Sequence, residues 1–184
     1  DSLSCAVFVE GYNTGPTDAL CLETDMLPQG CEPEQTAAVI ERFDVIIVGA
    51  GISGIGSATL LRQHCPDLSI AILESMDSFG GTWLIHKYPG TRSDSDLFTF
   101  GYGFKPWKGD PIASRQQILD YLAEAIDDAV LAPHMRYGHE VHAADWSREN
   151  ATWTLQVARK DLGDVVQFEA GFLLMSQGYY RHSE

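Results

Sequence analysis

The chain has 184 residues, 45% of them apolar, so its length and composition suit one domain with a sizeable hydrophobic core. A formal charge of −14 argues against a surface that binds nucleic acid or anionic lipid. No apolar run is long enough to span a membrane and no secretory signal is visible, so we expect a cytoplasmic protein.

The first 42 residues differ in composition from the rest of the chain. They carry eight acidic residues and one basic residue, and their Gly, Pro and Asn residues interrupt any sustained period. This pattern predicts an acidic, partly disordered or loosely packed extension, 1–42, before a domain at 43–184. The cysteines show no metal-ligand spacing, which favours reduced thiols but leaves a disulfide within 1–42 open. They are Cys5, Cys21, Cys31 and Cys65.

The stretch 43–74 organises the domain. A β-branched run at 45–48 predicts a strand buried on both faces, and a helical stretch at 52–63 and a second buried strand at 69–73 follow. The intervening glycines, in G-x-G-x-x-G spacing, are Gly49, Gly51 and Gly54. Strand, glycine loop, helix and strand together indicate a dinucleotide-binding fingerprint rather than an ordinary turn.

Each part of the loop has a physical role. Gly49 permits a tight turn, Gly51 lets a pyrophosphate approach the backbone, and Gly54 lets helix and strand pack closely. The helix begins at Ile52 and Ser53, where free N–H groups and a partial positive charge attract phosphate.

Two further positions are expected at the carboxyl edge of the sheet. Glu74 ends the second strand, where its carboxylate can accept hydrogen bonds from ribose hydroxyls and repel a 2′-phosphate. This favours FAD or NAD over NADP. Gly178 follows a later apolar strand and could bring its backbone near the same nucleotide.

A long segment without clear periodicity, 75–107, comes next. Such connections within compact domains are usually functional or disordered, and its many aromatic residues disfavour disorder. Gly81 and Thr82 can present backbone and hydroxyl groups to a ligand. Arg92 and Asp94 have two interpretations: an ion pair in a surface loop, or part of a ligand-lining segment.

The remaining pattern predicts an α/β fold. An amphipathic helix starts at Ser114 and runs to about Leu131, with an apolar stripe that includes Val130, and Pro133 stops it. We then expect a third parallel strand, an antiparallel meander of three short strands and a last apolar strand. Their ranges are 135–141, 142–147, 152–158, 165–168 and 172–176.

Four motifs, VGAGISG, ILE, FGGTW and YPG-x-R-x-D, give the chain a family resemblance. Over about 43–180 it resembles the class B flavin-dependent monooxygenases, most closely the Baeyer–Villiger type. This implies a Rossmann-like FAD-binding domain of the glutathione-reductase type. FAD would be held by Gly49, Gly51, Gly54 and Glu74, with Gly81, Thr82 and Trp83 against the pyrophosphate and ribityl chain.

The resemblance also implies roles for more distant positions. Val141 would offer its backbone to the adenine. Asp94, with Arg92 nearby, would lie beside the flavin as a catalytic candidate, since in the family this acid orients an arginine supplied later in the chain. Members use NADPH and O2 to oxygenate a ketone, a sulfide or an amine.

The chain lacks two features of the family. It has no second G-x-G-x-x-G for NADPH and no F-x-G-x-x-x-H-x-x-x-W signature. We therefore expect the N-terminal part of a monooxygenase, incomplete or inactive alone. The alternatives are a non-catalytic flavin-binding remnant, and one chain of a split enzyme that needs a second chain or C-terminal domain. A disulfide reductase is disfavoured because 75–184 contains no cysteine.

Overall fold

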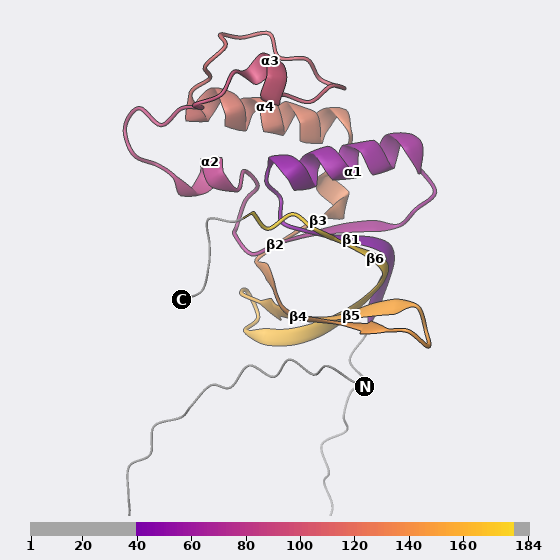
Figure 1. The fold of residues 1–184 in the computed structure, drawn as a ribbon. Helices are drawn as coiled ribbons and strands as arrows, with labels where there is room; N and C mark the ends of the chain where they lie inside the picture. The colour runs from indigo at the N-terminus through magenta and orange to yellow at the C-terminus, as the bar shows by residue number, and fades with distance from the viewer. Residues whose placement is uncertain (1–39, 179–184) are drawn as a thin grey trace, which may run out of the picture. The chain divides into compact units, whose positions relative to one another are not determined.

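The structure, a computed structural model, describes residues 40–178. The predicted extension, apart from its last three residues, lies outside this range, as do Cys5, Cys21 and Cys31. Within it, six strands form one mixed sheet in the order β3-β2-β1-β6-β5-β4. Figure 1 shows helices α1 and α4 on one face of the sheet, and strands β4 and β5 curving beneath the other face.

The strands are β1 Glu41–Val48, β2 Ile70–Glu74, β3 Met135–Tyr137, β4 His139–Ser147, β5 Thr152–Arg159 and β6 Asp164–Met175. The helices are α1 Ile52–His64, α2 Thr82–Ile85, α3 Leu97–Phe100 and α4 Arg115–Asp128, with a short 3-10 helix, η1 Ala132–His134.

The predicted βαβ unit is confirmed. β1 and β2 pair in parallel, with Ile47 opposite Ile72, and α1 connects them. The central residues of both strands are buried because apolar clusters cover both faces of the sheet. β1 begins at Glu41, before the first expected strand residue, because Glu41 already pairs with Phe168 of β6.

The two expected segments 165–168 and 172–176 are one strand, β6, and their separation was wrong. Its first part pairs antiparallel with β5, and its later part pairs parallel with β1. Gly171 lies inside this strand, where a β-carbon would lie 3.3 Å from the Asp44 carbonyl oxygen. The glycine thus accommodates a close backbone approach within the strand.

The expected third strand, 135–141, is also corrected. β3 ends at Tyr137, and Gly138, at φ +65°, turns the chain into β4. Val141 therefore belongs to the antiparallel strand β4, next to a β-bulge between Val141 and Ala143. The physical reason is the left-handed backbone at Gly138, which a β-strand cannot continue through.

Helix α4 starts as predicted and ends earlier. The Ser114 hydroxyl accepts from the Gln117 N–H, and the Gln117 side chain accepts from the Ser114 N–H, which makes a capping box. The helix ends at Asp128, not near Leu131. Val130 is 64% exposed, so its place in the apolar stripe was wrong.

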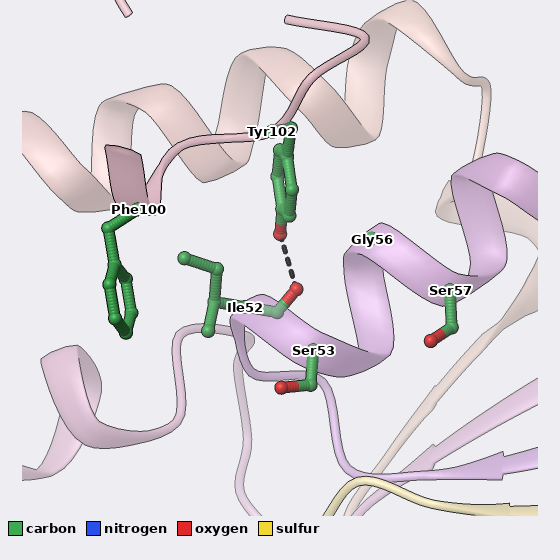
Figure 2. A pocket seen from close by; sticks show the side chains of 6 residues that line it. All are labelled: Ile52, Ser53, Gly56, Ser57, Phe100 and Tyr102. Carbon is green, nitrogen blue, oxygen red and sulfur yellow. Dashed lines mark hydrogen bonds between the residues drawn. The ribbon is translucent and has the colours of Figure 1, made fainter. Parts of the chain in front are cut away.

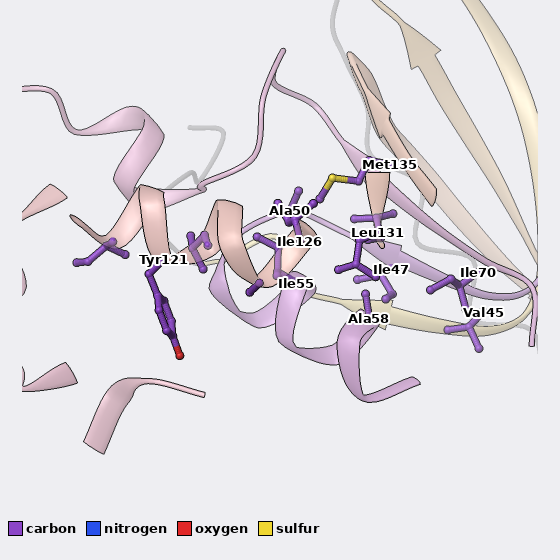
Figure 3. Close-up of a cluster of buried hydrophobic side chains, with 14 of the residues drawn as sticks. Val45, Ile47, Ala50, Ile55, Ala58, Ile70, Tyr121, Ile126, Leu131 and Met135 are labelled. Atoms are coloured by element: carbon purple, nitrogen blue, oxygen red, sulfur yellow. The ribbon is translucent and has the colours of Figure 1, made fainter. Parts of the chain in front are cut away.

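Two apolar clusters make the core. The larger, between the sheet and helices α1 and α4, contains Ile47, Ile55, Leu122 and Ile126 (Figure 3). The smaller lies on the other face of the sheet and includes Phe168. No helix within 40–178 is long and apolar enough to cross a membrane.

The segment between β2 and α4 contains two short helices, α2 and α3, which the pattern did not predict. The Asp96 carboxylate caps α3 by accepting from the Thr99 N–H at 2.9 Å. Each helix is a single turn, too short to produce a visible hydrophobic period.

Candidate dinucleotide-binding site

Two glycines of the loop after β1 are required by the fold itself. Gly49 has φ +103°, and a β-carbon there would lie 2.6 Å from the Ser176 carbonyl oxygen. A β-carbon on Gly54 would lie 1.9 Å from the Gly49 carbonyl oxygen, so no side chain fits at that position. These contacts fix the turn out of β1 and hold α1 close to the strand.

Gly51 differs from both neighbours in the motif. Its φ is −83°, which any residue can adopt, and a β-carbon there would meet only the Gly81 Cα, at an ordinary 3.6 Å. Gly81 is more restricted, since its φ is +52° and a β-carbon on it would lie only 3.0 Å from the Gly51 Cα. Gly51 and Gly81 therefore form a surface of backbone without side chains, here called the cradle. No described residue fills the space beside Gly51.

The start of α1 supplies donors next to this cradle. The first hydrogen bond of the helix runs from the Ile55 N–H to the Gly51 carbonyl oxygen, 3.0 Å away. Among the described residues, none accepts a hydrogen bond from the N–H of Ile52, Ser53 or Gly54. Free donors at a helix N-terminus favour an anion, since the helix dipole adds partial positive charge there.

Glu74 joins the end of β2 to the glycine loop. Its Oε2 accepts a hydrogen bond from the Ala50 N–H at 2.8 Å, and its Oε1 accepts one from the Met76 N–H at 2.8 Å. The residue is only 7% exposed. The Ser75 hydroxyl also donates to Oε1, at 3.4 Å. Each carboxylate oxygen has about two acceptor positions, so Oε2 keeps capacity for a ribose hydroxyl.

The segment around Gly81 is tied to the glycine loop by backbone. The Gly80 N–H donates to the Ala50 carbonyl oxygen at 2.9 Å. Thr82 begins α2 directly after the cradle, and the partly buried Trp83 packs against the larger core cluster. The structure thus brings Gly81 and Thr82 beside the glycine loop.

The other predicted cofactor contacts lie on β4 and after β6. The Ser176 N–H donates to the Val48 carbonyl oxygen at 2.8 Å, which brings the end of β6 beside the glycine loop. Gly178 follows two residues later, with φ +77° and open space around it. Val141 lies in β4 and packs against the smaller core cluster.

Arg92 and Asp94 are placed differently. Both are exposed, no ion pair within 40–178 joins them, and Asp94 accepts a 3.3 Å hydrogen bond from the Ser95 hydroxyl. Their backbone pairs with the residues before α4, since the Ser93 N–H donates to the Ala113 carbonyl oxygen. The ion-pair interpretation of these two residues was therefore wrong.

A shallow groove of about 330 Å³ runs along the outer side of α1 (Figure 2). It is lined by Ile52, Ser53, Gly56, Ser57, Phe100 and Tyr102. The Tyr102 hydroxyl donates to the Ile52 carbonyl oxygen at 2.5 Å, a contact between residues 50 positions apart. The sequence pattern does not predict this contact, and its one trace there is a further glycine, Gly56, inside the predicted helix.

Burial raises the pKa of the Tyr102 hydroxyl, and the neighbouring Tyr121 raises it further. The hydroxyl therefore keeps its proton and remains a donor at neutral pH. The described part of the chain shows no cluster of three metal-binding side chains, and Cys65 is a free, exposed thiol.

Comparison with known proteins gives the site its family context. A family described as "NAD(P)-binding Rossmann-like domain" matches residues 47–122. The FAD-containing monooxygenase EthA of Mycolicibacterium smegmatis is 46% identical over 145 residues, which are 78% of this chain and 29% of that protein. EthA of Mycobacterium tuberculosis is 42% identical over the same shares of both chains.

The chain matches one part of the flavin-dependent monooxygenases of the Baeyer–Villiger type. Among solved monooxygenases, an oxidized steroid monooxygenase bound to NADP aligns with a TM-score of 0.68 and 28% identity, covering 78% of this chain and 27% of the enzyme. OTEMO in complex with FAD and NADP aligns at 0.65 and 29%, covering 77% and 27%. The chain thus spans less than a third of the length of these monooxygenases.

Proposed function

We propose that this domain binds FAD as the dinucleotide-binding part of an NADPH- and O2-dependent flavoprotein monooxygenase. The observation that carries the proposal is the cradle at Gly51 and Gly81. Nothing in the described fold uses the space beside Gly51, while the unpaired N–H groups at the start of α1 lie next to it. A pyrophosphate suits that space in size, charge and hydrogen bonding.

Different residues of the site would contact different parts of the dinucleotide. The N–H groups of Ile52, Ser53 and Gly54 would bind the pyrophosphate, and Thr82 would contact it from the opposite loop. Glu74 would accept hydrogen bonds from the adenosine ribose, and its charge would repel a 2′-phosphate. The backbone of Val141 would face the adenine, and Gly178 would approach the nucleotide from the end of β6.

FAD, when bound, supplies the ring that accepts hydride from NADPH and reacts with O2. The FAD-bound and NADP-bound relatives support this assignment of cofactors. Asp94 would lie on the flavin side of the site, with Arg92 beside it, once the rest of the catalytic apparatus is present. The substrate would be a small ketone, sulfide or amine, as in the family.

The NADPH site is proposed to lie outside this sequence, because its 184 residues contain a single G-x-G-x-x-G. Oxygenation would then require a second polypeptide or a C-terminal domain. The same observation favours a second candidate function, a flavin-binding module without catalysis of its own.

Thermal unfolding with added dinucleotides tests the proposal. A ligand that binds only the folded state raises the unfolding temperature by an amount that grows with the ratio of its concentration to Kd. We expect FAD to raise the unfolding temperature of this domain and NADP⁺ at the same concentration to raise it less. A stabilisation by NADP⁺ without one by FAD would reject the assignment.

A further inference from the structure

The Tyr102 side chain connects the loop after α3 to the first turn of α1. Its hydroxyl donates to the carbonyl oxygen of Ile52, the first residue of the helix, directly after the N-cap Gly51. That carbonyl belongs to the same turn that presents the unpaired N–H groups of Ile52 and Ser53. The hydrogen bond therefore acts on the segment proposed to bind the pyrophosphate (Figure 2).

Gly56 makes this contact possible. A β-carbon at Gly56 would lie 2.8 Å from Tyr102 Cε1, so any side chain there would displace the ring. Glycine within a helix costs about 1 kcal/mol relative to alanine. The close approach of the Tyr102 ring to the α1 backbone explains why glycine stands at position 56 despite this cost.

Tyr102 also contacts Tyr121 of α4 and the neighbouring Phe104. Its ring stacks on Phe104 and Tyr121, with centroid distances of 4.7 and 5.5 Å. Its N–H donates to the Tyr121 hydroxyl at 2.7 Å, and that hydroxyl donates to the Lys105 carbonyl oxygen at 2.6 Å. Tyr102 thus contacts both Tyr121 of α4 and Ile52 in the first turn of α1, and it links the two helices.

We propose that Tyr102 is a positioning residue for the dinucleotide site, which holds the first turn of α1 in the orientation that directs its N–H groups at the pyrophosphate. The inference rests on the proposed function for its ligand. Its structural part, the restraint of that turn, stands without any ligand. Supporting residues that hold ligand-binding groups in place increase affinity, because less conformational entropy is then lost when the ligand binds.

Tyr102→Phe is the direct test, because it keeps the stacked ring and removes only the hydroxyl. Hydrogen exchange in the FAD-free protein should become faster at 55–57, the first hydrogen-bonded amides of α1, while exchange at the end of α1, 61–64, stays unchanged. FAD affinity should fall about three- to tenfold, the value of one hydrogen bond. The unfolding temperature should change little.

Gly56→Ala provides a second variant, since the added methyl group displaces the ring. It should produce the same local rise in exchange and a larger loss of FAD affinity. Tyr88→Phe is the matched control, because Tyr88 is 63% exposed and its loss of a hydroxyl should change neither quantity.

Unchanged exchange at 55–57 in Tyr102→Phe would overturn the inference, whether or not FAD binds. Uniformly faster exchange over all of α1 would also overturn it, since that indicates a general structural role. If the wild-type protein binds no FAD, the proposed function fails, but the exchange experiment still decides whether Tyr102 restrains the turn.

Discussion

Gly51 and Gly81 meet backbone to backbone: a β-carbon on Gly81 would lie 3.0 Å from the Gly51 Cα. The loop after β1 and the start of α2, about 30 positions apart in sequence, thus form one bare surface. The two positions are glycine for different reasons. Gly81 needs its left-handed backbone, at φ +52°, whereas Gly51, at φ −83°, has only the space beside it to explain the missing side chain.

Gly51→Val should therefore abolish FAD binding while the domain stays folded. The valine methyl groups would fill the space proposed for the pyrophosphate, and the backbone angle at Gly51 is compatible with a side chain. Flavin absorbance titration measures the affinity, and circular dichroism measures the fold. Gly103→Val is the matched control, because Gly103 has open space around it. Wild-type FAD affinity in Gly51→Val would show that Gly51 serves the turn alone.

Glu74→Gln should weaken both FAD binding and the fold. The amide has one oxygen acceptor instead of two, so either the Ala50 or the Met76 N–H would face an NH2 group. Leaving a buried donor unpaired costs about 1–3 kcal/mol, and FAD affinity should fall about tenfold or more. Urea unfolding and flavin titration measure the two effects. Glu124→Gln is the control, since that carboxylate is 68% exposed and pairs only at the surface.

Val130→Gly should stabilise the domain. Val130 occupies the left-handed position after α4, at φ +51°, and the Leu131 N–H donates to the Ile126 carbonyl oxygen at 2.9 Å, as in a Schellman motif. A left-handed backbone costs an L-residue about 1–2 kcal/mol, which exceeds the entropy cost of glycine, so a gain of about 1 kcal/mol is expected. Urea unfolding measures it.

Val165→Gly serves as the control for this substitution. Val165 is also exposed, at 62%, but lies in strand β6, where glycine should destabilise. Equal effects of the two substitutions would mean that the backbone at Val130 stores no strain.

Asp44 should make stability depend on acid pH. The Ser69 hydroxyl, 2.6 Å from Asp44 Oδ2, and then the Ser69 N–H lower the pKa of this carboxyl below its ordinary 3.8. The stability from this pair is therefore full above that value and is lost as pH falls through the folded pKa. Asp44→Asn should show a smaller drop in unfolding temperature between pH 7 and pH 3, and Asp67→Asn, at an exposed site, should retain the full drop.

The chain alone should not oxygenate substrates. Its sequence has one nucleotide fingerprint, and hydride transfer needs a nicotinamide held beside the flavin in a site closed to water. The measurement is NADPH oxidation with FAD and a ketone or sulfide present, on this chain and then with added monooxygenase polypeptides that carry a second G-x-G-x-x-G. Substrate-dependent turnover by the chain alone would contradict this expectation.

The part of the fold that could be predicted is local in sequence. The β1–α1–β2 unit has its strands, glycines and acid within about 30 consecutive residues, and the capping box at Ser114 lies within four. β6 was divided wrongly because its two halves pair with different strands, and pairing across a sheet leaves no signal in the strand itself. The expected third strand, 135–141, was too long because the left-handed turn at Gly138 lies within it.

In the site, too, residues that belong to short local patterns could be predicted, and residues with contacts distant in sequence could not. Glu74 and Gly81 could be predicted as site candidates because each belongs to a recognisable short pattern, and the structure brings both to the glycine loop. Tyr102 was missed because its contact with Ile52 crosses 50 positions. Arg92 and Asp94 suggested an ion pair through sequence proximity alone, but the backbone pairing of Ser93 with Ala113 directs this strand-like segment toward α4 instead.

Parallel titrations of the purified chain with FAD and with NADP⁺ decide which dinucleotide the glycine loop and Glu74 select. The flavin titration follows the shift in absorbance and the quenching of fluorescence, and calorimetry follows NADP⁺. We expect saturable FAD binding and, because Glu74 repels the 2′-phosphate, at least tenfold weaker NADP⁺ binding, a difference of about 1.4 kcal/mol. Tighter binding of NADP⁺ than of FAD would contradict it.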